Sequence, residues 1–358
     1  MSDFIKFFDK TTFLVLVLIV IMGAGLIFSA AQGGNNNYFM MHLIKIAISL
    51  FLFFAVLVMK IETINRWSFT VYIILLIVLV LQLLSGKIIS GTRSWIKMGV
   101  LSLQVSEFIK IPLALILAKH LTRIQILTWK AFLKVAVLIM IPFILIALQP
   151  DMGTAFILVS FFIFSILLKK IKLSIVIASI LLIGAGSFLM WNYMLKPYQK
   201  DRIISFADPA KYSRSSGYQI IQSKIAFGSG GLTGKGYLKG SQSRYKFLPT
   251  RHTDFIASVL GEEFGFLGIS FLLLLFFILF YRQFNFRVSS GEEFYFIYLF
   301  TGLIFFQFLV NILMVTGLFP VLGIPLPFVS YGGSSMLAFS IGEGIIFKMK
   351  VESFLQQK

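Results

Sequence analysis

Residues 68–85 read SFTVYIILLIVLVLQLLS, an uninterrupted run without a charged side chain. A helix rises about 1.5 Å per residue, so a helical run of this length is about 27 Å long. That length is close to the ~30 Å thickness of the hydrocarbon core of a bilayer. The run therefore predicts a membrane-spanning helix.

Similar runs lie on both sides of this one. Nine further apolar segments lie at 11–31, 40–59, 103–121, 130–148, 151–168, 172–193, 254–281, 294–317 and 328–348. The chain is 58% hydrophobic and 13% charged, with mean hydropathy +0.93, whereas soluble domains are about half apolar and a quarter charged. These values exclude a soluble enzyme, a coiled coil and a disordered chain. We expect an all-α polytopic membrane protein with about ten transmembrane helices, in which residues 1–358 form a single integral membrane domain.

The distribution of positive charge predicts the orientation of the helices, because cytoplasmic loops carry an excess of Lys and Arg. With the N-terminus inside, the short outer loops hold only Lys87, Arg93 and Lys97. We therefore expect a bacterial inner-membrane protein with both termini in the cytoplasm. The chain has no cysteine, which agrees with this location and excludes disulfides and thiolate metal sites.

One outer loop breaks this charge pattern. Residues 195–253, between the seventh and eighth helices, contain eleven Lys or Arg and two acids, Asp201 and Asp208. Long loops are translocated largely regardless of charge, so the orientation stands. The loop is either a large solvated segment of a lysine-rich protein or a basic surface that faces an anionic, membrane-borne substrate. We expect no nucleic-acid partner, because much of the net charge of +18 lies in short loops and follows the topology rule.

Charged side chains inside a membrane span are costly and usually face a cavity or a partner. Glu107 and Lys110 lie in the fourth span at positions i and i+3, so they share one face of the helix and can pair. They form either a structural ion pair or one polar wall of a substrate cavity. Pro112 lacks a backbone N–H and is expected to bend this helix.

Asp151 lies at the start of the sixth span, between Pro150 and Gly153. Pro150 suits a first helical position, and Asp151 suits a first turn, where the helix dipole favours an anion. This capping role accounts for Asp151 without chemistry, although a direct chemical role stays open.

Trp95 lies on the third, outer connection and is flanked by Arg93 and Lys97. A tryptophan at the membrane surface usually anchors a span at the headgroups. With two cations beside it, Trp95 is also suited to stack on a sugar or to guide a phosphate.

Asp254 lies where the basic loop re-enters the membrane, next to Arg251 and His252. Thr253 or Asp254 can serve as the N-cap of the eighth span. Alternatively, one positioned carboxylate is sufficient for a general base that accepts a proton from a sugar hydroxyl. Glu262 and Glu263 lie deeper, and we expect them to pair with Lys45, Lys110 or Lys134, or to line the same cavity.

These candidates share one side of the membrane. The connections that hold Trp95, Asp151, Asp254 and the Gly332–Gly333 turn are all odd-numbered, so all of them face outward. Chemistry at the outer leaflet has no access to ATP. The glycine-rich stretch 228–236 accordingly fails the phosphate-loop pattern, which requires a glycine at position 229 and Ser or Thr at position 236.

Longer motifs indicate a family. Residues 311–335 read NILMVTGLFPVLGIPLPFVSYGGSS, and this stretch resembles the signature of the SEDS family (shape, elongation, division and sporulation). QPDMGTA at 149–155 and HTDFI at 252–256, followed by GEE at 261–263, resemble two further family motifs. The resemblance extends from the first span to the last. The short N-terminus and the variant PVLGIPLP at 320–327 resemble the elongation branch of the family.

The resemblance implies a peptidoglycan glycosyltransferase that polymerises lipid II, a disaccharide-pentapeptide on undecaprenyl diphosphate. Asp254 matches the essential acid of the family and would act as the general base, while the basic loop would stabilise the leaving diphosphate. Glu107 and Lys110 match residues of the central cavity, and Trp95 matches an outer-loop tryptophan needed for function. The remaining candidates are Arg93, Arg251, His252 and Ser330 for substrate binding, and Asp151, Glu262, Gly332 and Gly333 for structure or substrate binding.

The resemblance also implies partners. These are a class B penicillin-binding protein of the penicillin-binding protein 2 type, which is the transpeptidase, and the elongation machinery. No cofactor is required by the motifs. A divalent cation, Mg²⁺ or Mn²⁺, shared by Asp254 and the substrate diphosphate stays open, because the sequence shows no multi-oxygen ligand set.

Two other functions compete with the glycosyltransferase. A lipid II flippase would also need intramembrane charges and a basic outer surface, although no inverted repeat is visible. A non-catalytic scaffold that recruits a transpeptidase would need the helices but not Asp254.

Overall fold

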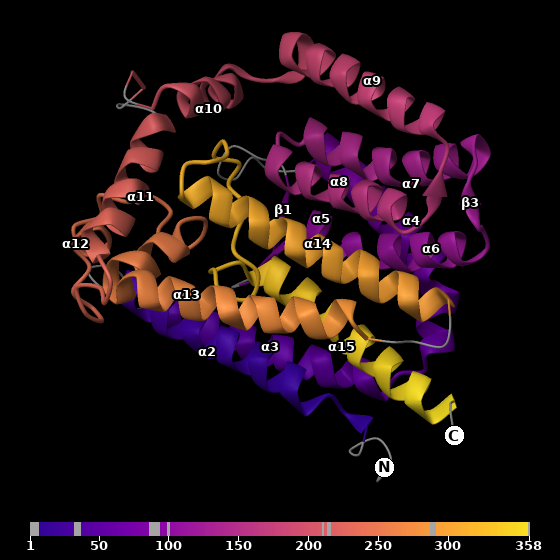
Figure 1. Cartoon of the computed structure of the whole chain (residues 1–358), viewed down its shortest axis with the longest axis horizontal. Helices are drawn as coiled ribbons and strands as arrows, with labels where there is room; N and C mark the ends of the chain where they lie inside the picture. Colours follow the sequence, from indigo (N-terminus) through magenta and orange to yellow (C-terminus); the bar gives the residue numbers. More distant parts are fainter. Residues whose placement is uncertain are drawn as a thin grey trace.

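The computed structural model describes residues 7–31, 37–85, 94–98, 101–209, 211–212, 216–286 and 291–356. The chain forms a bundle of long helices, and shorter helices gather at one end of it (Figure 1). The bundle helices are α2 (Lys10–Ala31), α3 (Asn37–Val58), α4 (Ile61–Ser85), α6 (Lys110–Thr122), α7 (Trp129–Leu148), α8 (Met152–Leu167), α9 (Leu173–Leu189), α13 (Ile256–Phe284), α14 (Gly291–Val315) and α15 (Gly333–Gln356).

The shorter elements connect these helices. They are β1 (Trp95–Met98), β2 (Leu101–Gln104), α5 (Val105–Phe108), β3 (Ile126–Leu127), β4 (Lys170–Ile171), the π-helical turn η1 (Met190–Met194), α10 (Pro197–Ala207), α11 (Ser216–Gly230) and α12 (Ser241–Arg244). β1 and β2 form an antiparallel hairpin, in which Trp95 is opposite Gln104, and β3 pairs with β4 in parallel.

Within the described ranges, seven helices are long and apolar enough to cross a bilayer: α2, α3, α4, α7, α9 with η1, α13 and α14. Helix α8 is apolar but has 16 residues, α6 has 13, and α15 carries charged side chains in its second half. The all-α polytopic architecture expected from the sequence is confirmed. The number of ten crossing helices stays a prediction.

The fourth apolar run, 103–121, is not one continuous helix. It begins in β2 and continues as α5 and α6, which are separated at Ile109. Pro112 lies three residues after this break. Proline lacks an N–H and cannot donate to the carbonyl of Phe108, but Ile109 keeps helical dihedral angles (φ −63°, ψ −22°) and its N–H donates to Val105 O. The bend at Pro112 stays a prediction.

Helix α14 lies in the middle of the bundle (Figure 1) and packs against α6, α8, α13 and α15. Two-thirds of its membrane window is buried, including the polar side chains of Gln307 and Asn311. Helix α9 lies at the edge of the bundle, and most of its window is exposed. The core is therefore centred on α14, next to the segment that carries the family signature.

The long segment 195–253 is largely helical rather than an extended loop, because it contains α10, α11 and α12. We call residues 195–253 the outer segment, and part of it forms hydrogen bonds at a kink in α13. At Gly265 the backbone of α13 leaves the helical conformation, with φ 62° and ψ −154°. Phe266 and Leu267 donate their N–H groups to the carbonyls of Gly231 and Leu232 instead of to their own helix.

The carbonyls released at the same kink are also bonded by this segment. Lys235 N donates to Glu262 O and Gly236 N donates to Glu263 O, both at 3.0 Å. A Cβ at position 234 would lie 2.1 Å from Glu263 O, so this close approach requires glycine. The outer segment is thus joined to α13 through four backbone hydrogen bonds.

Both chain termini lie at the same end of the bundle (Figure 1). Asp9 accepts hydrogen bonds from Arg282 and Lys350, at the ends of α13 and α15, and the ring of Phe7 stacks on that of Phe354. The starts of α13 and α15 are at the opposite end, where Tyr331 N donates to His252 O. The two termini therefore lie at the same end of the bundle, as expected for two ends on one side of a membrane. That this side is the cytoplasm stays a prediction.

Candidate functional site

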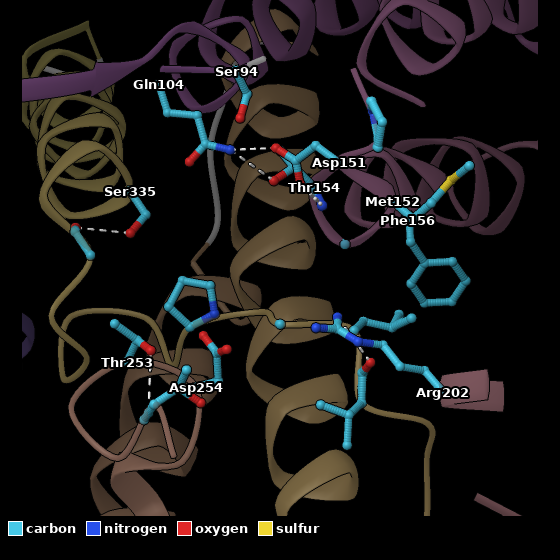
Figure 2. A pocket seen from close by; sticks show the side chains of 18 of the residues that line it. Ser94, Gln104, Asp151, Met152, Thr154, Phe156, Arg202, Thr253, Asp254 and Ser335 are labelled. Atoms are coloured by element: carbon cyan, nitrogen blue, oxygen red, sulfur yellow. Dashed lines mark hydrogen bonds between the residues drawn. The ribbon is translucent and has the colours of Figure 1, made fainter. Parts of the chain in front are cut away.

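A cavity of about 710 Å³ lies at the end of the bundle opposite the termini. Its walls come from the β1–β2 hairpin, the turn between α7 and α8, helix α10, the turn before α13 and the segment between α14 and α15. Figure 2 shows that residues from all these segments point into a common space. Of the candidates from the sequence, Trp95, Glu107, Asp151, His252, Asp254 and Gly332 line it.

The turn that carries Asp254 is held by its backbone. Asn311 of α14 donates Nδ2 to the carbonyls of Asp254 at 2.9 Å and of Ile324 at 2.7 Å. The Ser330 hydroxyl donates to Thr253 O at 2.6 Å and accepts from Leu326 N at 2.8 Å. The segment 311–335 therefore fixes this turn, and Ser330 lies behind the cavity wall rather than on it.

The capping interpretation of Asp254 is wrong. Helix α13 begins at Ile256 with Phe255 at the N-cap position, and no side chain caps it. The Asp254 side chain is free of that role and points into the cavity (Figure 2). In the described part of the chain it forms no salt bridge.

Arg202 of α10 approaches Asp254 across Gly323. A Cβ built on Gly323 would lie 3.6 Å from Asp254 Oδ2 and 3.7 Å from Arg202 Nη1, so the two side chains lie on the same side of this glycine. Burial raises the pKa of the Asp254 carboxyl to about 6, although the positive charge of Arg202 and a hydrogen bond from Thr253 both lower it. The carboxyl is thus poised to exchange a proton near neutral pH.

Asp151 caps helix α8. Its carboxylate accepts from Thr154 N at 3.3 Å and from the side-chain amide of Gln104, as the dashed lines in Figure 2 show. The capping prediction is confirmed, with the correction that Asp151 is the N-cap and Pro150 precedes the helix. Since Asp151 also lines the cavity, both of its interpretations fit its position.

Glu107 and Lys110 form the expected ion pair, with 2.9 Å between Lys110 Nζ and Glu107 Oε2. Glu107 lines the cavity, and Lys110 lies behind it, 1% exposed. The two interpretations left open by the sequence therefore hold together, because a buried ion pair forms part of the cavity wall.

Trp95 lies on β1 of the hairpin, directly opposite Gln104. Both residues line the cavity. Gln104 N donates to the Ser334 hydroxyl at 2.8 Å, so the hairpin is attached to the start of α15. Arg93, predicted beside Trp95, lies outside the described residues.

The side chains of Arg251 and His252 lie in different surroundings. Arg251 Nε donates to Ala30 O at 2.8 Å, so its guanidinium joins the turn to the end of α2 and does not line the cavity. His252 lines the cavity with its ring 5.0 Å from that of Tyr38 and 6.0 Å from that of Tyr331. Burial lowers the pKa of His252, and the charge of Arg251 lowers it further, so a neutral imidazole is expected at pH 7.

Glu262 and Glu263 do not have the expected partners and do not line the cavity. Glu262 accepts from Lys235 Nζ at 2.6 Å, the Ser241 hydroxyl at 2.9 Å and Gln242 N at 3.0 Å. Glu263 accepts from the Ser29 hydroxyl. The predicted pairs with Lys45, Lys110 or Lys134 are wrong, because the outer segment folds back onto α13 and supplies the partners of Glu262, while α2 supplies Ser29 to Glu263.

The cavity residues that the sequence analysis does not single out include Arg202, Gln104 and Tyr331. Arg202 was counted only as one of eleven basic residues in the outer segment. Its place at the site depends on α10 folding back over the cavity, which the composition does not reveal. Tyr331 belongs to the signature stretch, where its position before Gly332–Gly333 was the available signal.

The described residues contain no group of three or more His, Asp and Glu side chains able to hold a metal ion. Asp254 is a single carboxylate with an arginine beside it. A divalent cation held there would need oxygen ligands from a substrate.

Comparisons with known proteins agree along the whole chain. The model of a family of cell cycle proteins, that of FtsW, RodA and SpoVE, matches residues 6–354. The peptidoglycan glycosyltransferase MrdB of Escherichia coli K12 is 34% identical over 352 residues, which cover 96% of this chain and 95% of that protein. The stage V sporulation protein E of Bacillus subtilis is 36% identical and covers 80% of this chain and 79% of its own length.

Solved structures have the same fold. A chain from a study of polymerization and crosslinking by a peptidoglycan synthase complex superimposes with a TM-score of 0.83 at 27% identity, covering 97% of this chain and 98% of that one. The rod shape determining protein RodA of Thermus thermophilus superimposes with a TM-score of 0.69 at 26% identity, with the same coverage of both chains.

Proposed function

This chain belongs to the FtsW, RodA and SpoVE family of cell cycle proteins, and from this premise and its cavity we propose that it is a peptidoglycan glycosyltransferase of the elongation type. It polymerises lipid II into glycan strands at the outer face of the bacterial inner membrane. Both termini then lie in the cytoplasm, on the side opposite the cavity.

The observation that carries the proposal is the environment of Asp254. A half-buried carboxyl with a pKa of about 6 points into a cavity of about 710 Å³ at one end of a multi-pass bundle. Pockets of about 300–1,000 Å³ hold ligands of the size of a disaccharide. A general base works best when its pKa is near the operating pH.

The reaction requires one base and one good leaving group. Asp254 removes the proton from the acceptor sugar hydroxyl as that oxygen attacks the anomeric carbon of the donor. The bond between that carbon and the lipid diphosphate breaks, and the diphosphate leaves with the electron pair. A second carboxylic acid, as in glycosidases, is not needed, because a diphosphate leaves without protonation.

Other cavity residues position the sugars and the charge. Trp95 offers an indole for stacking on a sugar ring, and Asp151, Gln104 and Thr154 form a hydrogen-bonded polar wall. Arg202 is close enough to Asp254 to stabilise negative charge that develops beside it.

The chain works with a class B penicillin-binding protein, which crosslinks the strands that it makes. A similar chain in a peptidoglycan synthase complex supports this partner. The remaining elongation machinery is proposed on the basis of the similarity to MrdB and RodA.

The test is polymerisation by purified protein. Wild type, Asp254→Asn and Asp201→Asn are incubated with lipid II, with and without a class B partner, and the products are separated on a gel. Asp201 is the control, because it is an exposed carboxylate on the same outer segment. Long glycans are expected from wild type and Asp201→Asn and not from Asp254→Asn.

Other outcomes would contradict the proposal in different ways. Glycans from folded Asp254→Asn would remove Asp254 as the base. No glycans from any folded variant, together with movement of lipid II across vesicles, would support a flippase. Normal cell-wall growth on Asp254→Asn in cells would support a scaffold.

A further inference from the structure

Helix α3 carries a lysine inside the bundle that no acid neutralises. Lys45 lies eight residues into α3 and is 6% exposed. Among the described residues it forms no salt bridge and no hydrogen bond. Its ammonium forms a cation–π contact with the ring of Tyr331, whose centroid lies 3.8 Å from Nζ. A buried ammonium without an anion is costly, and such residues in membrane spans generally mark a functional site.

The ammonium is directed toward the start of helix α15. A Cβ built on Gly333 would lie 2.8 Å from Lys45 Cε and 3.1 Å from Nζ. The lysine side chain therefore lies against the first turn of α15, in space that only a glycine at position 333 leaves open.

The first turn of α15 has free donors. The backbone N–H groups of Gly333, Ser334 and Ser335 have no acceptor in the described part of the chain, because the first helical bond runs from Met336 N to Gly332 O. Three unpaired N–H groups and the positive end of a long helix attract an anion. Gly332, Ser334 and Ser335 line the large cavity, so two of the three donors belong to residues of its wall.

A second unpaired group lies beside them. His42, one turn before Lys45 on α3, is 1% exposed, and neither of its ring nitrogens has a hydrogen-bond partner. Its ring lies 5.9 Å from that of Tyr331. Tyr331 lines the cavity, so this side chain stands between the cavity and two buried basic groups.

We propose that Lys45 and the first turn of α15 form a receptor for a diphosphate group, the diphosphate of the lipid-linked sugar donor. Lys45 supplies the charge, the N–H groups of residues 333–335 supply the directional hydrogen bonds, and Tyr331 closes the site toward the cavity. The inference rests on the proposed function, since it assigns the diphosphate of that substrate to one wall. It also gives Gly333 a role, because the missing Cβ leaves the space in which Lys45 lies against the first turn of α15.

The test uses the full-length chain in nanodiscs of phosphatidylcholine and measures binding of inorganic diphosphate and of a polyprenyl diphosphate. The variants are Lys45→Met, Lys45→Arg and Gly333→Ala. Lys239→Met is the matched control, because Lys239 is exposed on the outer segment and its replacement removes the same charge. Thermal midpoints are recorded for each variant.

Lys45→Met is expected to weaken binding of both ligands about tenfold or more, the effect of losing one charge-assisted hydrogen bond. Its thermal midpoint is expected to stay level or rise, because a buried uncompensated charge is removed. Lys45→Arg should retain most of the binding. Gly333→Ala should weaken it, because the added Cβ displaces Lys45. Lys239→Met should bind like wild type.

Several results would overturn the inference. These are wild-type binding by folded Lys45→Met, no binding by wild type, or a lowered midpoint in Lys45→Met with no rescue by Lys45→Arg, which would assign Lys45 a structural role. Loss of inorganic diphosphate binding alone would show a free-anion site instead of a donor site. Binding is measured without turnover, so a chain that binds through Lys45 but makes no glycan would refute only the proposed function.

Discussion

Asp254 and Glu262 lie eight residues apart at the outer end of α13, yet their environments are opposite. Glu262 is fully buried, and Lys235, Ser241 and the backbone N–H of Gln242 donate to it. Asp254 lies in a cavity and forms no salt bridge with any residue that the structure describes, and burial raises its pKa to about 6. The first carboxylate holds the fold together, and the second is left available for a ligand.

The difference shows that the role of a charged residue near a membrane cannot be deduced from its residue type alone. Both acids lie in motifs that resemble family motifs, and both follow the basic outer segment. The two acids differ in whether that segment folds back and donates hydrogen bonds to them. A carboxylate that accepts several hydrogen bonds within the protein is expected to contribute to stability. One that lacks such partners is expected to contribute to catalysis at some cost in stability.

The largest expected difference between the two acids concerns catalysis. Asp254→Asn should lower the rate of lipid II polymerisation about 10²–10⁴-fold, the usual contribution of a general base. Its thermal stability at pH 7 should stay level or rise by about 1–3 kcal/mol, because the folded state disfavours the ionised carboxyl. Rate and thermal midpoint are measured on the same preparation. A variant that loses activity only because it unfolds would contradict the comparison.

The next effect is the pH dependence of the rate. Asp254 must be ionised to accept a proton, and its pKa is raised to about 6. Activity should therefore be present above pH ~6 and fall about tenfold per unit below it, as protonation removes the base. The measurement is kcat/KM for lipid II from pH 4.5 to 8. A flat profile through this range would exclude a single carboxyl of this pKa as the base.

A smaller effect is expected when Glu262, the acid that accepts several hydrogen bonds, is changed. Glu262→Gln should destabilise the fold by about 1–3 kcal/mol, because the bonds from Lys235 and Gln242 lose their charged acceptor. Polymerisation per folded molecule should change much less than in Asp254→Asn. Thermal unfolding and activity normalised to folded protein test this. An activity loss equal to that of Asp254→Asn at unchanged stability would show that the two acids act together.

The smallest effect sharpens the description of Asp254 itself. Arg202 lowers the pKa of this carboxyl, against the larger effect of burial. Arg202→Gln should therefore move the acidic limb of the rate profile to higher pH, whereas Arg202→Lys should leave it nearly in place. Profiles of both variants are recorded beside wild type. A downward shift in Arg202→Gln would contradict the proximity of the two groups.

The sequence predicted the helical membrane fold and the central acid, because both depend on local patterns. Apolar runs of membrane length are visible directly, and so is a carboxylate next to Arg251 and His252. The cap on α8 was also predictable, since Asp151 precedes the helix it caps.

Contacts between distant segments were not predictable in the same way. The partner of Glu262 is Lys235, which reaches it only because residues 231–236 enter the kink of α13. Arg202 carries no local signal either, and Lys45, a charge inside the predicted span 40–59, was expected only as a partner of Glu262 or Glu263. Their positions depend on α10 folding over the cavity and on α3 packing against α15.

The kink at Gly265 has a consequence for the dynamics of the outer surface. Two hydrogen bonds that would normally lie within α13, from Phe266 N to Glu262 O and from Leu267 N to Glu263 O, are replaced by four bonds to residues 231–236. The amides of Phe266 and Leu267 can therefore exchange with solvent only when the outer segment detaches, although they lie within a long helix. These two amides should exchange together with those of Lys235 and Gly236, so that two sequence-distant stretches open as one cooperative unit. A protein or ligand that binds the outer segment and holds it in place would thus slow hydrogen exchange inside a membrane helix that it does not contact.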